Sequence, residues 1–171
     1  MKKLTVVLSA LAVIFLVLAI LSASYSVSRT EAAIAAIGTV SYDEASKEKI
    51  DLANTYFTEL DASLRLEERV ANLDVLTAAK AEYVRLAIKT AVVKDQRKLA
   101  DGYTDEEVTA AVAAAREALD SYFGEGAGPV VENYFDLIAL EEQYAASDDN
   151  QPAEAEDSDN SEKSEEKINL C

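Results

Sequence analysis

The chain has 171 residues, of which 32 are acidic and 16 basic, a formal net charge of −16, and neither histidine nor tryptophan. Histidine is the commonest general base and metal ligand in proteins, so its absence removes most catalytic and metal-site templates. The negative charge argues against a nucleic-acid partner, because basic surfaces bind phosphate backbones. We therefore expect a non-enzymatic protein with no cofactor, metal site, nucleic-acid partner or small-molecule substrate.

The N-terminus has the layout of a membrane or export segment, since Lys2 and Lys3 precede an uncharged apolar run at 4–21. As a helix this run is about 27 Å long, just enough for a bilayer core of about 30 Å. Ser22 and Ser24 place small residues where a signal peptidase cleaves, before Tyr25. We predict that residues 1–26 are a signal peptide or a signal-anchor transmembrane helix. The body is extracytoplasmic either way: single-pass in the cell membrane, or secreted if cleaved near Ser24.

The middle of the chain repeats a helical pattern. The stretch VANLDVLTAAKAEY at 70–83 returns as VENYFDLIALEEQY at 131–144, with the same apolar positions. Apolar residues at 50, 53, 57 and 60, and again at 108, 112, 115, 119 and 122, follow helical spacing. Nothing interrupts the helical pattern between 64 and 100. The sequence therefore predicts an all-α fold, in which the apolar helix precedes two tandem three-helix-bundle repeats (27–83 and 84–146) sharing a long helix.

Helix ends are marked by capping signals. Ser41 with Glu44, and Thr104 with Glu107, match the S/T-x-x-E capping box. Gly38 and Gly102 stand where a preceding helix ends in positive φ. The GEGAGP stretch at 124–129 predicts the end of one helix, with Pro129 in the first turn of the next.

Residues 147–171 are rich in acids and contain no aromatic residue, a composition that predicts a disordered acidic tail. The tail ends at Cys171, the one cysteine of the chain. A single thiol makes no internal disulfide, so we expect it to be free or to form an intermolecular bridge.

The strings AAIAAIGTVSYDEASKEKIDLANTYFTEL and VANLDVL resemble the helical repeats of large secreted and wall-associated surface proteins of Gram-positive bacteria. The resemblance covers about residues 31–144 in two copies, and Asn72 and Asn133 carry most of it. Leu73 departs from the pattern, which has Tyr there, and LADGYT replaces the Ala-Ile-Gly opening in the second copy. The resemblance implies spacers or adhesive modules and brings no set of functional residues.

Charge is distributed unevenly, because six bases lie between positions 80 and 98, whereas residues 101–144 are strongly acidic. The candidate contacts are Lys80, Arg85, Lys89, Lys94, Arg97 and Lys98. One hypothesis is that they contact anionic cell-wall polymer, lipid headgroups or the acidic face of another copy. The alternative is that they only solvate the shared helix. Asn72 and Asn133 are interpreted as bonding nearby backbone groups, with ligand binding as the alternative.

These features together predict a surface-exposed spacer or protein-interaction module, either membrane-tethered or secreted, whose partner is a protein or an anionic cell-wall polymer. The alternative is a small membrane-anchored regulatory subunit that docks on an integral-membrane partner. A docking subunit should need specific side chains within 4–21, whereas a spacer should tolerate their replacement by poly-leucine.

Overall fold

The computed structural model describes residues 2–60 and 62–148, and this part of the chain is helical, without a strand. The helices are α1 (Lys2–Ala35), α2 (Glu44–Thr58), η1 (Ala62–Leu64), η2 (Glu67–Arg69), α3 (Leu73–Gln96), α4 (Lys98–Asp101), α5 (Asp105–Phe123) and α6 (Tyr134–Asp148). The predicted disordered tail begins at 147, but α6 includes residues 147 and 148. Residues 149–171 lie outside the described part.

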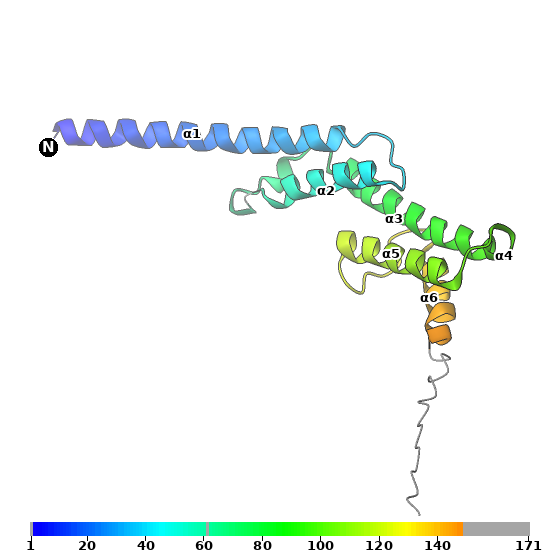
Figure 1. The fold of residues 1–171 in the computed structure, drawn as a ribbon. Helices are drawn as coiled ribbons and strands as arrows, with labels where there is room; N and C mark the ends of the chain where they lie inside the picture. Colours follow the sequence, from blue (N-terminus) through cyan, green and yellow to red (C-terminus); the bar gives the residue numbers. More distant parts are fainter. Residues whose placement is uncertain (1, 61, 149–171) are drawn as a thin grey trace, which may run out of the picture.

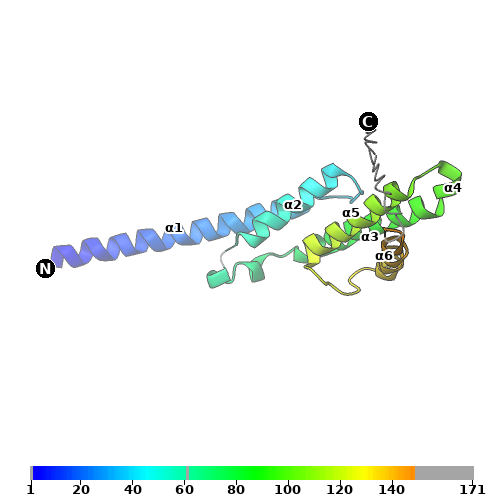
Figure 2. The ribbon, with the colours of Figure 1, turned by 60° about the horizontal axis from the view of Figure 1, so that its bottom comes forward.

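Helix α3 joins two groups of helices (Figures 1 and 2). It packs against α1 and α2, which also contact each other, and it packs against α5 and α6, which likewise contact each other. The result is an elongated arrangement in which α1 projects from one end and α6 lies toward the other. We call α1–α2–α3 the first group and α3–α5–α6 the second group. The interpretation of the groups as copies of one repeat rests on the sequence pattern.

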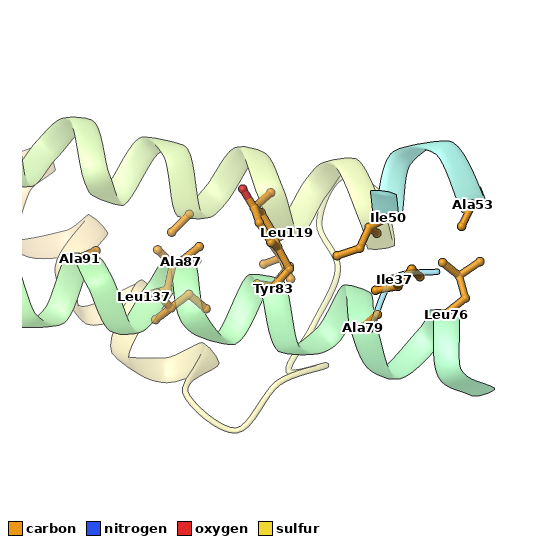
Figure 3. Close-up of a cluster of buried hydrophobic side chains, with 14 of the residues drawn as sticks. Ile37, Ile50, Ala53, Leu76, Ala79, Tyr83, Ala87, Ala91, Leu119 and Leu137 are labelled. Atoms are coloured by element: carbon orange, nitrogen blue, oxygen red, sulfur yellow. The ribbon is translucent and has the colours of Figure 1, made fainter. Parts of the chain in front are cut away.

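The two groups bury apolar side chains along α3 from Leu76 to Ala91 (Figure 3). In the first group, Ile37 and Ile50 meet Leu76, and each of these side chains is at most 2% exposed. In the second group, Leu119 and Leu137 lie against the later turns of α3 and have no exposed surface. The core of one group runs directly into the core of the other, because α3 contributes to both.

The repeated stretches occupy similar surroundings. Leu76 and Leu137 are fully buried, and Tyr83 and Tyr144 are 5% and 6% exposed, so the leucine and the tyrosine that the two stretches share face the core. Their first residues, however, precede the helices, because α3 begins at Leu73 and α6 at Tyr134.

The prediction of one uninterrupted helix from 64 to 100 is wrong at both ends. Before α3, the Ala71 N–H donates to the Glu31 carboxylate and the Asn72 side chain bonds the Glu31 carbonyl, so α1 holds this segment outside a helix. After α3, the chain breaks at Arg97 and turns through α4, where Leu99 is 99% exposed. The polar residues at 94–98 give this part of the chain no apolar stripe that packing could hold in one continuous helix.

One of the two predicted capping boxes forms. Thr104 caps α5, where its hydroxyl accepts the Glu107 N–H and the Glu107 carboxylate accepts the Thr104 N–H. Ser41 does not cap α2; the N-cap is Asp43, whose carboxylate accepts the Ser46 N–H at 2.8 Å. A charged carboxylate is the stronger acceptor, and this bond lowers the pKa of Asp43.

Glycines end helices as predicted, with φ of 67° at Gly38 and 77° at Gly102. The prediction that Pro129 occupies the first turn of the next helix is wrong, because α6 begins five residues later, at Tyr134. The Asn133 side chain donates to the Arg85 carbonyl on α3, and this bond holds the chain just ahead of the helix start.

Candidate partner-binding surface

The N-terminal part of α1 is an apolar helix with exposed side chains. The segment Leu11–Ala35 is long and apolar enough to cross a membrane, and a signal sequence at this position passes the same test. Its large side chains up to Leu21 are exposed, including Phe15 at 67%. Consecutive exposed apolar residues need a covering that the body of the protein does not provide.

The same helix enters the first group without a break. Val27, Thr30 and Ile34 are buried, and the Thr30 hydroxyl lies 3.2 Å from the Tyr56 carbonyl of α2. Arg29 lies over the ring of Tyr56, 3.9 Å from its centroid, and pairs with Glu59 at 3.0 Å. The exposed apolar segment and the turns that are buried in the first group are therefore two parts of one continuous helix.

The six predicted contact bases point toward different neighbours. Lys80 reaches the Asn54 side-chain oxygen on α2, and burial lowers its pKa. Arg85 pairs with Glu82 at 2.6 Å, on the same turn of α3. Lys89 is exposed, and with Arg85 it lines a depression that also contains Glu132 and Asp136, so two acids offset the two bases.

The other three bases lie around the far end of α3. Lys94 stands over the Tyr103 ring, 5.7 Å from its centroid. Arg97 pairs with Asp101 at 3.0 Å, and Lys98 pairs with Asp105 at the start of α5. Arg85 and Lys89 line one depression, whereas the three bases at the end of α3 each face a different partner. Binding of an anionic polymer stays a prediction.

Asn72 and Asn133 occupy matching places in the two groups. The Asn72 amide donates to the Glu31 carbonyl at 3.1 Å, and the Asn133 amide donates to the Arg85 carbonyl at 3.0 Å. Each bond runs from the start of the last helix of a group to the first helix of that group. The backbone interpretation is confirmed, but the acceptors are 41 and 48 residues away in the chain and not local.

Two tyrosine–aspartate bonds between helices were not predicted. The Tyr122 hydroxyl on α5 donates to Asp51 on α2 at 2.8 Å and so ties the second group to the first. The Tyr144 hydroxyl on α6 donates to Asp95 on α3 at 2.6 Å. The Tyr122 bond joins residues 71 positions apart, and no local sequence pattern marks such a partner.

Within the described residues, no three or more His, Cys, Asp or Glu side chains gather as a possible metal site. No family model matches the chain, and no match is found among curated proteins or solved structures. The resemblance to Gram-positive surface repeats therefore rests on the sequence pattern alone.

Proposed function

We propose that this chain is a non-enzymatic, surface-exposed spacer or protein-interaction module held to a membrane by α1. One observation carries the proposal. The exposed apolar part of α1 continues without a break into turns that form the core of the first group. A bilayer covers an all-round apolar helix of this length, and the stiffness of an α-helix then couples the body to the membrane.

Packing around the predicted cleavage site favours retention of the anchor. Residues 22–24 lie inside α1, and Ala23 packs against the core cluster. The Ser26 hydroxyl donates to the Ser22 carbonyl at 3.1 Å, across the same turn. A signal peptidase could cleave after Ser24 only before the first group folds, or when this turn of α1 unfolds locally.

The arrangement of the two groups supports a spacer role. Because α3 belongs to both, the second group cannot move as a unit without bending a helix or breaking the Tyr122–Asp51 bond. The elongated body (Figure 2) then displays α5 and α6 at a fixed separation from α1. The acidic residues of this region keep the displayed surface hydrated.

The topology is tested on intact cells with a membrane-impermeant maleimide, which should label Cys171 without lysis. The matched control moves the single thiol across the membrane, by combining Cys171→Ser with Lys2→Cys, and should be labelled only after lysis. Labelling of Lys2→Cys in intact cells, or protection of Cys171 until lysis, would place the body on the cytoplasmic side and contradict the proposal.

A second experiment separates a spacer from a docking subunit. Residues 4–21 are replaced by poly-leucine, which keeps the length and apolarity of the helix and removes its particular side chains. A spacer should stay in the membrane fraction with an unchanged pattern of cross-linked partners. Loss of a cross-linked integral-membrane protein on this replacement would favour a regulatory subunit instead.

A further inference from the structure

A cavity of about 220 Å³ lies where the two groups meet. Tyr42 and Glu44 line it from the start of α2, Tyr83 from α3, and Glu117 and Tyr122 from α5. Lys47, Ala114, Ala118 and Ser121 complete the lining. Because α2 and α5 belong to different groups, this cavity exists only when both are seated on α3.

Three tyrosine rings form the aromatic part of the lining. Tyr42 and Tyr83 have ring centroids 5.2 Å apart and planes inclined by 54°. Tyr83 and Tyr122 are 6.0 Å apart and nearly perpendicular, at 86°. In Figure 3, Tyr83 extends from α3 toward α5 beside Leu119. The rings contact one another and together form an aromatic wall of the cavity. An ammonium group that enters the cavity can lie against this wall, where the negative π faces attract a cation.

The charge around the cavity is negative. Glu44 and Glu117 form no ion pair within the described residues, whereas Lys47 pairs with Asp51 at 3.2 Å, and Asp51 also accepts the Tyr122 hydroxyl. Three carboxylates thus face one ammonium. Burial first, and then Tyr42 and the nearby carboxylates, raise the pKa of Tyr83 to about 12. Burial is the largest cause of that shift, and the Glu44, Asp51 and Asp43 carboxylates add to it because they oppose ionisation of the phenol.

The size of the cavity limits the ligand. Pockets for drug-sized molecules have volumes of about 300–1,000 Å³, so this smaller space suits a single side chain. Its lining includes apolar Ala114 and Ala118 as well as the charged residues. A lysine side chain combines a methylene stem with a terminal ammonium and matches both kinds of lining.

We propose that this cavity binds a lysine side chain of a protein partner, with the ammonium among Tyr42, Tyr83 and Tyr122 and neutralised by Glu44 and Glu117. The proposal rests on the proposed function as an interaction module and assigns the chemistry of the partner. Lys47 also lines the cavity and pairs with Asp51, while Glu44 and Glu117 act on it through weaker electrostatic attraction without an ion pair.

The test uses the full chain in zwitterionic detergent micelles, with ¹³C-labelled tyrosine rings observed by NMR. The probe is N-acetyl-lysine-N-methylamide, and the matched probe is the norleucine analogue, which has the same stem and no charge. We expect the lysine probe to shift the Tyr42, Tyr83 and Tyr122 resonances with a dissociation constant on the order of 1–10 mM. The norleucine probe should leave them in place.

Variants separate the cavity from general charge effects. Glu44→Gln combined with Glu117→Gln should weaken lysine binding at least about fivefold, since two charges are removed. The control combines Glu48→Gln with Glu106→Gln, which are exposed residues on the same two helices, outside the cavity lining, and should leave the constant unchanged. Equal shifts with norleucine, no shift at a lysine concentration about tenfold above the expected constant, or equal weakening by both double variants would each overturn the proposal.

The outcome is independent of where the protein resides, because the titration uses purified chain. Failed lysine binding with external labelling of Cys171 would leave the membrane-tethered module standing. Lysine binding together with protection of Cys171 until lysis would refute the proposed topology and support the proposed lysine site.

Discussion

Leu76→Ala and Leu137→Ala test whether the two groups form one structural unit. The two residues are 61 positions apart, are 1% and 0% exposed, and pack at matching places in the first and second groups. Truncating a fully buried leucine removes its transfer free energy and leaves a cavity, which together cost about 3 kcal/mol. For a helical body of this size, that loss lowers the melting temperature by roughly 10 °C. We therefore expect both variants to lose similar stability.

The assay is thermal unfolding of the full chain in detergent micelles, followed by circular dichroism at the helix band. Since α3 supplies core residues to both groups, each variant should show a single transition shifted as a whole. Leu99→Ala is the matched control, because Leu99 is 99% exposed and its truncation should leave the transition in place. Two separate transitions, of which each substitution moves only one, would refute the shared role of α3.

Thr104→Ala removes the capping box of α5 and should cost about 1 kcal/mol in the free energy of unfolding measured with denaturant, whereas Ser41→Ala, at a residue that caps nothing, should cost far less. Tyr83 and Tyr144 have pKa values raised to about 12, mainly by burial, against about 10 when unfolded. The stability that their neutral phenols contribute is complete below pH 10 and should be lost as the pH rises from 10 through 12, as pH-dependent melting would show. If the basic residues bind anionic polymer, binding at low salt should weaken when four of them, Lys89, Lys94, Arg97 and Lys98, are replaced by glutamine. Unchanged binding of the polymer by this variant would refute that hypothesis.

The helices and much of the core could be predicted from the sequence, because they depend on local periodicity. Ile50 and Leu119 lie on apolar stripes of helical spacing, and both are fully buried. Thr104 with Glu107 is a local signal that fixes the start of α5. These features depend on residues within a turn or two of each other, where sequence spacing and spatial proximity coincide.

The features that join distant segments could not be predicted. Asn72 was expected to bond its own surroundings, yet its acceptor is the Glu31 carbonyl on α1, and this contact helps to decide where α3 begins. Tyr122 and Asp51 meet only because α3 carries both groups. The basic residues are close in the sequence, but a helix rises about 1.5 Å per residue, so Lys80 and Lys94 lie about 21 Å apart along α3. Lys80 therefore meets α2, whereas Lys94 meets Tyr103 beyond the end of α3.

The tyrosine-lined cavity between the two groups illustrates the same limit. Tyr42, Tyr83 and Tyr122 are separated by about forty residues at each step, and nothing in their local sequence groups them. Their convergence depends on how α2 and α5 are seated on α3, which is a property of the tertiary packing.

The mass of the protein in the membrane fraction tests most directly the proposal that α1 is one helix joining membrane and body. We predict a product of about 18.5 kDa that retains the apolar segment and pellets with membranes after alkaline extraction. A shorter, soluble product beginning at Tyr25 would contradict the account, because α1 would then have lost its apolar part before the body was displayed.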